Sequence, residues 1–195
     1  MLANLTKLTD EELIAEFQRD NEQAFTVLVG KYKDPLTNFV FRFMGDWNDC
    51  DDVVQETFVR VFRNKHSYKP VAKFSTWLYT IATNLAKTQL RKRKLRSLLS
   101  LGTNKADDHE LVLDIPDEHS KTDSRVEASF KQEHIQRALE TLSVKYREVV
   151  VMRDVQDLSY EEIAAITGLN LGTVKSRINR ARTQLQGLLR DIWND

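Results

Sequence analysis

The sequence predicts an all-α protein of two small helical domains joined by a flexible acidic linker, with a helix-turn-helix as the C-terminal domain. The 195 residues include only six Gly and three Pro, and they are rich in residues of high helix propensity. Hydrophobic residues make up 41% of the chain and charged residues 30%, which is enough apolar material for compact domains. Apolar residues also recur at helical spacing, so helices are expected along most of the chain.

The N-terminal part is expected to form three consecutive helices. The first begins at Thr9, where LTDEEL supplies an N-cap and Glu12 for a capping box. The second carries apolar residues from Phe25 to Phe43 and contains Pro35, which is expected to kink or restart it. The third follows GDWND and is expected to turn these residues inward: Val53, Val54, Phe58, Val59 and Phe62.

Residues 73–94, KFSTWLYTIATNLAKTQLRKRK, predict an amphipathic helix that ends in a block of cations. A helical projection gathers these residues in one apolar sector: Phe74, Trp77, Leu78, Ile81 and Leu85. A polar strip lies outside that sector: Thr76, Thr80, Thr83, Lys87 and Arg91. Asn84 lies at the edge of the strip beside Trp77, and Tyr79 lies almost opposite the apolar sector. The strip fits the solvated face of a core helix, and it also fits a surface along a nucleic-acid strand, where cations neutralise phosphates.

Residues 97–124 lose this periodicity and gain acidic residues, which is typical of an interdomain linker. The linker separates a first domain, residues 1–96, from a second, residues 125–195. The second domain is expected to begin with a helix whose apolar stripe includes Phe130, Ile135 and Leu139.

The stretch LSYEEIAAITGLNLGTVKSRINRARTQL predicts two helices joined by a tight turn. Ser159 and Glu162 form a capping box, Gly168 ends the short first helix in a left-handed conformation, and Asn170 caps the second helix. Such a unit with a basic second helix is a helix-turn-helix, whose second helix enters the major groove of DNA. The other interpretation is a helical hairpin with a solvated cationic face.

The outward side of this second helix is small or polar: Gly172, Thr173, Ser176, Asn179, Arg180 and Thr183. Ser176 and Arg180 are placed to contact base edges. Neighbouring cations lie on the flanks, nearer to phosphates: Lys175, Arg177 and Arg182.

Charge is unevenly distributed although the chain has a formal net charge of zero. Residues 57–96 contain 11 Lys or Arg and no Asp or Glu, whereas residues 1–56 contain 5 Lys or Arg and 12 Asp or Glu. Two basic tracts, this one and the final helix, indicate two phosphate-facing surfaces.

Several classes of site have no support in the sequence. There is no Gly-rich phosphate loop, metal-spaced His/Cys cluster or nucleophile motif, so we expect no catalytic residue, cofactor, metal or small-molecule substrate. Cys50 is the only cysteine and is interpreted as an incidental small residue. With no apolar run of about 20 residues and no signal peptide, a cytoplasmic protein is expected.

Three stretches in this order, DDVVQETFVRVF, FSTWLYTIATNLA and LSYEEIAAITGLNLGTVKSRINRAR, resemble the extracytoplasmic-function (ECF) sigma factors of bacterial RNA polymerase. The resemblance covers nearly the whole chain, and it implies a region 2 domain, a linker and a region 4 domain. It also implies that the chain binds core RNA polymerase and promoter DNA without performing covalent chemistry. Such proteins are usually held inactive by an anti-sigma factor, often one in the membrane.

The resemblance assigns roles to three groups of residues. Those that match the segment docking on the polymerase's largest subunit are Asp51, Asp52, Gln55 and Glu56. Those assigned to the minus-ten element form two groups. The residues that capture a flipped base are Tyr68, Trp77 and Asn84. The residues of the polar strip that contact the same element are Thr76, Thr80, Thr83, Lys87 and Arg91. Those assigned to the minus-thirty-five element are Thr173, Lys175, Ser176, Arg177, Asn179 and Arg180. The rival hypotheses are a stand-alone helix-turn-helix regulator, which would bind a palindrome without polymerase, and a helical adaptor without affinity for DNA.

Overall fold

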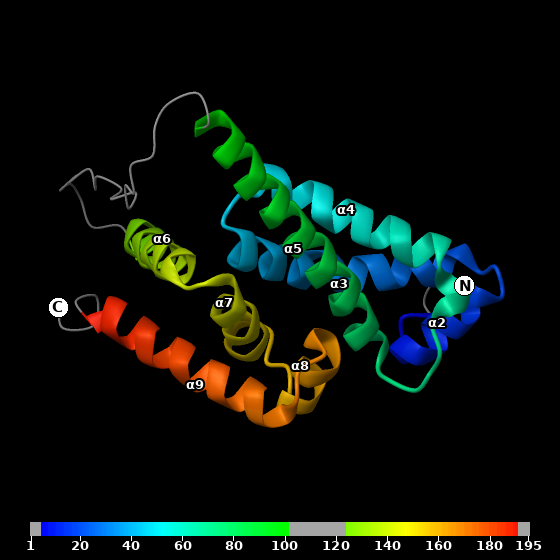
Figure 1. Cartoon of the computed structure of the whole chain (residues 1–195). Coiled ribbons are helices and arrows are strands. Elements are labelled where there is room, and N and C mark those ends of the chain that lie inside the picture. The colour runs from blue at the N-terminus through cyan, green and yellow to red at the C-terminus, as the bar shows by residue number, and fades with distance from the viewer. Residues whose placement is uncertain (1–4, 102–123, 191–195) are drawn as a thin grey trace.

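The computed structural model describes residues 5–101 and 124–190, which contain helices and turns but no strand. The first group of helices comprises α2 (Asp10–Gln18), α3 (Glu22–Met44), α4 (Trp47–Arg63), a short 3-10 turn η1 (Lys65–Ser67) and α5 (Phe74–Leu101). The second group comprises α6 (Ser124–Thr141), α7 (Val144–Val150), η2 (Val151–Val155), α8 (Tyr160–Thr167) and α9 (Leu171–Leu188). The predicted all-α fold is confirmed for these residues (Figure 1).

The expected start of the first helix is confirmed. The Thr9 hydroxyl accepts a hydrogen bond from the Glu12 backbone N–H, and Glu12 accepts one from the Thr9 N–H, so both halves of the capping box are present. Helix α3 runs through Pro35 without the restart that was expected. Pro35 is exposed, while Tyr32, Leu36 and Phe39 around it are buried, so tertiary packing holds the two halves of α3 in one helix.

Three other expectations need correction. Val59 was expected to point inward, but 38% of its surface is exposed. The ring of Phe62 does pack against Phe17 and Phe25, although 44% of its surface stays exposed. Phe130 was expected in the apolar stripe of α6, but it is 56% exposed, with its ring against that of His134. Helix α5 continues to Leu101, past the expected start of the linker, since no Gly or Pro interrupts residues 97–101. Most of the expected linker, residues 102–123, lies outside the described residues.

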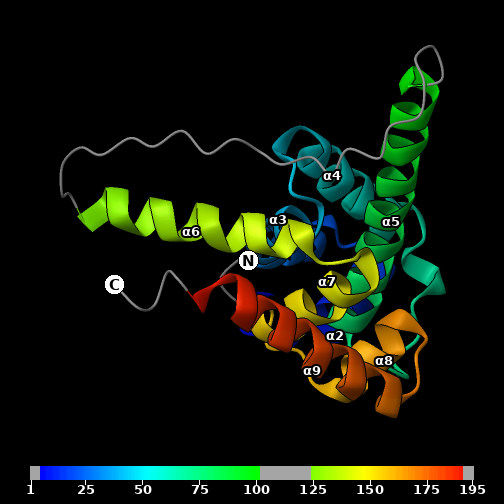
Figure 2. The ribbon, with the colours of Figure 1, turned by 60° about the vertical axis from the view of Figure 1, so that its left-hand side comes forward.

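The two groups of helices pack on each other around one continuous hydrophobic core. Helix α6 lies across α3, and α8 lies beside the first half of α5 (Figure 2). Gly45 ends α3 with φ 77°, and a Cβ there would lie 2.3 Å from Glu140 Oε1 of α6. The left-handed φ therefore favours glycine at this position, and a larger residue would also have to displace the exposed Glu140 side chain.

Candidate nucleic-acid and polymerase interfaces

The polar strip of α5 faces the second group of helices. Lys87 Nζ lies 2.5 Å from Glu148 Oε1 of α7, and Lys73 Nζ lies 2.8 Å from Glu162 Oε1 of α8. Between them along α5, the Tyr79 hydroxyl donates to Gln156 Oε1, at the end of η2, over 2.6 Å. The side of α5 that carries the strip is therefore the side that meets α7, η2 and α8.

The strip is consequently less exposed than the sequence predicted. Thr76 is 7% exposed and Thr83 only 1%, whereas both were expected on the polar side, away from the core. Tyr79, expected almost opposite the apolar sector, is also buried, with its ring edge-on to Phe39. Its burial raises the pKa of the Tyr79 phenol to about 12. A helical projection of α5 alone gives the correct angular positions of these side chains around the helix axis. It cannot show that the second group of helices covers that side of α5.

One edge of the strip remains accessible. Asn84 is exposed, and Trp77 is half-buried between Tyr68, with ring centroids 5.4 Å apart, and Phe74, at 6.1 Å. Tyr68 is itself buried, and its hydroxyl donates to the Ala72 carbonyl. The structure thus brings Tyr68, Trp77 and Asn84 to one edge of α5, with Tyr68 beneath the indole rather than on the surface.

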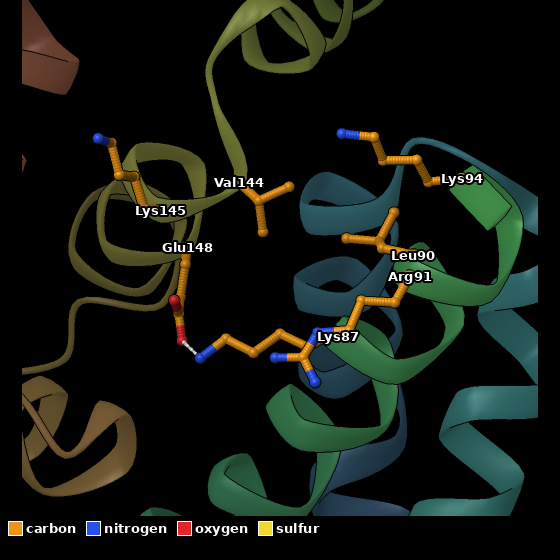
Figure 3. A pocket seen from close by; sticks show the side chains of 7 residues that line it. All are labelled: Lys87, Leu90, Arg91, Lys94, Val144, Lys145 and Glu148. Carbon is orange, nitrogen blue, oxygen red and sulfur yellow. Dashed lines mark ion pairs between the residues drawn. The ribbon is translucent and has the colours of Figure 1, made fainter. Parts of the chain in front are cut away.

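Cations crowd the other end of the strip, beside the Lys87–Glu148 pair. A groove of about 390 Å³ lies there between α5 and α7 (Figure 3). Besides the ion pair, its lining comprises Leu90, Arg91, Lys94, Val144 and Lys145. Positive side chains therefore come to this groove from both groups of helices.

Glu148 is the buried acid at the interface between the two groups of helices that sequence reasoning missed. It is 3% exposed, and burial raises the pKa of its carboxyl while the Lys87 ammonium acts in the opposite direction. Its sequence context, YREVVV, contains no signal that distinguishes it from a solvated acid on an amphipathic helix. An acid facing α5 could have been inferred only if the polar face of α5 had been known to be buried.

The helix-turn-helix forms as predicted. The Ser159 hydroxyl accepts from the Glu162 N–H, Glu162 accepts from the Ser159 N–H, and Gly168 ends α8 with φ 70°. Asn170 Oδ1 accepts from the Thr173 N–H and caps α9. Local capping chemistry thus fixes both helices and the turn between them.

The outward side of α9 is open to solvent where base contacts were expected. The exposed residues of the predicted set are Lys175, Ser176, Asn179 and Arg180, whereas Thr173 and Arg177 are half-buried. The Ser176 hydroxyl donates to the Thr173 carbonyl, and the Arg180 guanidinium lowers the pKa of the nearby Tyr146 phenol. Arg182 differs from these cations, because it pairs with Asp154 of η2.

The acidic face of α4 adjoins α5, because Asp52 and Glu56 line a pocket with Thr88 and Lys92 of α5. Asp51, Asp52 and Gln55 are exposed, while Glu56 is half-buried and pairs with Arg60 one turn later, at 2.8 Å. The neighbouring Cys50 is buried, which raises the pKa of its thiol to about 11, so the thiol stays protonated at neutral pH.

Two other kinds of feature are absent from the described part of the chain. Within residues 5–101 and 124–190, no three His, Cys, Asp or Glu residues are grouped so as to hold a metal ion. Over the same residues, no helix has the length and apolar character needed to cross a membrane.

Comparison with known proteins yields matches along nearly the whole chain. The family model for Sigma-70 region 2 matches residues 28–96, and that for Sigma-70, region 4 matches residues 132–185. The ECF RNA polymerase sigma factor SigW of Bacillus subtilis is 33% identical over 179 residues, covering 92% of this chain and 96% of the relative. The RNA polymerase sigma-H factor of Pseudomonas aeruginosa is 33% identical over 196 residues, covering 98% of this chain and 99% of the relative.

Two solved structures are similar in fold. CnrH, in complex with the cytosolic domain of CnrY, gives a TM-score of 0.68 at 26% identity, covering 93% of this chain and 97% of CnrH. The sigma factor RpoE from Bartonella quintana, in complex with the anti-sigma factor NepR, gives 0.64 at 28% identity, covering 85% and 96%.

Proposed function

Because the chain belongs to the ECF family of RNA polymerase sigma factors, we propose that it uses three separate surfaces to initiate transcription. The α4 face binds core RNA polymerase, the α5 edge holds the melted minus-ten strand, and α9 reads the minus-thirty-five duplex. The protein contributes binding energy and positioning, and no covalent chemistry. A stand-alone helix-turn-helix regulator is not favoured, because the relatives match both groups of helices.

The observation that supports the proposal is that one chain carries two different exposed surfaces whose chemistry suits nucleic acid. Helix α9 presents an exposed row of small and polar residues with Arg180 on a capped helix-turn-helix, which suits base edges in a major groove. Helix α5 presents an aromatic ring beside an amide, Trp77 beside Asn84, at the edge of a basic helix. An aromatic ring and an amide suit an unpaired base, since the ring stacks and the amide both donates and accepts.

The proposed mechanism assigns one task to each surface. The protein binds core polymerase and directs it to the promoter, where Ser176 and Arg180 contact base edges of the duplex and flanking cations contact phosphates. Once strands separate, Trp77 supports a base swung out of the stack and Asn84 binds its edge. Lys87 and Arg91 neutralise phosphates of that strand. Opening of the minus-ten element is favoured because the α5 edge binds its separated strand and not its paired form.

The solved neighbours bear on regulation. CnrH and RpoE were each solved with a partner, and for RpoE that partner is an anti-sigma factor. We propose that this protein also has an anti-sigma partner and acts in the cytoplasm. A membrane-bound partner would hold it at the membrane.

Asn84→Ala is expected to reduce promoter opening about tenfold, because a two-point contact to a base edge is worth about 1–3 kcal/mol. Opening can be followed by permanganate reactivity of the melted strand with purified protein and core polymerase. Binding to core and thermal stability should be unchanged, since Asn84 is exposed. Asn38→Ala on α3, also exposed, is the matched control. If Asn84→Ala left promoter opening unchanged, the α5 edge would be an ordinary solvated face with no role in strand binding.

Asp51→Lys is expected to weaken binding to core polymerase by at least about tenfold, since a like charge placed in a charged interface costs several kcal/mol. The control is Asp34→Lys on α3, which makes the same charge change at another exposed acid of the first group. Affinity for core can be measured by fluorescence anisotropy at several salt concentrations. The difference should shrink as salt rises, because exposed charges are screened. Equal losses in both variants would argue against a specific role of the α4 face.

A further inference from the structure

Helix α2 lies beside the connection between α4 and α5, residues 64–73, here called the α4–α5 loop (Figure 1). This loop carries Tyr68 and leads into the turn of α5 that carries Trp77. Helix α2 precedes residues 28–96, which match the region 2 family model, and none of the three proposed surfaces includes it. Its side chains nevertheless form hydrogen bonds with both ends of the loop.

Gln18, the last residue of α2, holds the first half of the loop. Its Nε2 donates to the Lys65 carbonyl, at 2.7 Å, and to the Tyr68 carbonyl, at 3.1 Å. In return, Lys65 Nζ donates to the Phe17 carbonyl, at 3.0 Å, and to Asp20 Oδ1, at 2.6 Å. The Lys65 side chain is only 15% exposed, so these bonds are partly shielded from water. Helix α2 and the loop thus each supply donors for backbone carbonyls of the other.

Glu11 holds the far end of the loop, where α5 begins. The Phe74 N–H, the first of α5, donates to Glu11 Oε1 over 3.1 Å. The first N–H groups of a helix usually find an acceptor on the residue just before it. Here that residue is Lys73, whose ammonium cannot accept a hydrogen bond and is paired with Glu162. Glu11 therefore supplies from α2 the cap that the local sequence lacks, and its carboxylate suits the positive end of the helix dipole.

The side chains proposed to capture a base lie between these two attachments. The Tyr68 ring lies under the Trp77 indole, with centroids 5.4 Å apart, and its hydroxyl donates to the Ala72 carbonyl over 2.8 Å. Residues 69–73 are exposed, with Val71 at 89%. The exposed stretch therefore has little packing of its own, and its placement depends on the two attachments to α2.

We propose that α2 positions the strand-capture site, with Gln18 and Glu11 as the positioning residues. They do not contact DNA; they hold the α4–α5 loop and the start of α5 in the arrangement that receives an unpaired base. The proposal rests on the proposed role of Trp77 and Asn84 in holding that base. Apparent affinity for the strand is proportional to the fraction of molecules that already have the arrangement, so loss of an attachment lowers it.

Gln18→Glu tests the donor, because a carboxylate of nearly the same size cannot donate to the Lys65 and Tyr68 carbonyls. If about nine loops in ten then leave the arrangement, promoter opening should fall about tenfold. Permanganate reactivity with the purified full chain and core polymerase measures opening. Gln18→Ala, which also removes the donor, should act in the same direction. Gln23→Glu makes the same chemical change at an exposed site of α3 and should leave opening unchanged.

Glu11 provides the complementary test, because its role is to accept. Glu11→Gln keeps an acceptor oxygen for the Phe74 N–H and should retain most of the opening. Glu11→Ala removes the acceptor and should lower opening in the same way as Gln18→Glu. Glu22→Ala, at an exposed acid in the first turn of α3, is the matched control. Equal losses in the glutamine and alanine variants would overturn the role of this hydrogen bond, since they would assign the effect to charge.

Two further measurements distinguish positioning from a general loss of fold. Hydrogen exchange in the free full chain should become faster at residues 64–73 in Gln18→Glu and stay unchanged in α3 and α4. Base preference is the second measurement. The captured position is the one whose 2-aminopurine substitute brightens on opening, and each of the four bases is then placed there. The spread of opening among the four should narrow in Gln18→Glu, whereas a protein that is merely less folded would lose the same factor for every base.

The outcomes separate this proposal from the proposed function. Unchanged exchange of the loop, or a loss of opening that is equal for all four bases, would overturn the positioning role of α2 and leave the roles of α5 and α9 intact. Normal opening in Gln18→Glu beside defective opening in Asn84→Ala would do the same. If neither variant altered opening, the strand-binding role of the α5 edge would fail, and the role of α2 with it. Faster exchange, reduced opening and a narrower base preference together support the positioning role.

Discussion

Replacing Leu78 with alanine should lower the free energy of unfolding by about 2–5 kcal/mol, the usual range for truncating a buried leucine. Leu78 is fully buried in the second turn of α5, at 0% exposure, and belongs to the core that α5 shares with α3 and α4. Truncation removes apolar contact and leaves a cavity, because helices packed on several sides cannot close in on the gap. Urea unfolding followed by circular dichroism measures the loss.

Leu98→Ala on the same helix provides the comparison, since Leu98 is 57% exposed. It should change stability by no more than about 0.5 kcal/mol, as surface substitutions usually do. The contrast also bears on Asn84→Ala, because loss of promoter opening in a stable protein is a different defect from loss of the fold. A small effect of Leu78→Ala would mean that α5 is not held in the core as described.

Local chemistry explains why much of the fold and of α9 could be predicted from the sequence. Capping boxes at Thr9 and Ser159, the left-handed Gly168 and the Asn170 cap depend on residues within a few positions of each other. A helical projection likewise identified the buried stripe of α5, because the angular position of a side chain is set by the helix itself. These features depend on residues within one or two helical turns of each other. Over that range a single sequence is enough to predict local structure.

The covered strip could not be predicted, because it depends on residues far apart in the chain. Lys87 meets Glu148, and Tyr79 meets Gln156, across the expected linker. A threonine on a polar face looks the same in the sequence whether water, DNA or another domain lies against it. The sequence could therefore identify a polar strip suited to a partner, but not that the second group of helices is one such partner.

Arg147→Ala is expected to destabilise the protein by at least about 3 kcal/mol, because a hydrogen bond to a charged group contributes about 1.5–3 kcal/mol and buried acceptors left unpaired add to the loss. Arg147 is 7% exposed. Its Nη2 donates to the carbonyls of Glu140, at 2.8 Å, and Leu142, at 3.1 Å, while Nη1 donates to the Phe43 carbonyl of α3, at 3.1 Å. One guanidinium thus satisfies carbonyls at the C-terminal ends of both α6 and α3, where helix carbonyls lack partners within the helix.

Arg147→Lys tests whether the positive charge of Arg147 or the planar shape of its guanidinium provides the stability. Lysine keeps the positive charge at these helix ends, but its single ammonium cannot reproduce the planar fork that reaches three carbonyls, so only part of the stability should return. Arg182→Ala is the matched control, since Arg182 pairs with Asp154 at a more exposed site and such pairs contribute about 0–1 kcal/mol. Because one of the three carbonyls lies on α3, Arg147→Ala should also increase the radius of gyration under conditions where the helices remain folded. A lysine variant as stable and as closed as wild type would show that charge alone, and not the fork, joins α3 to the second group of helices.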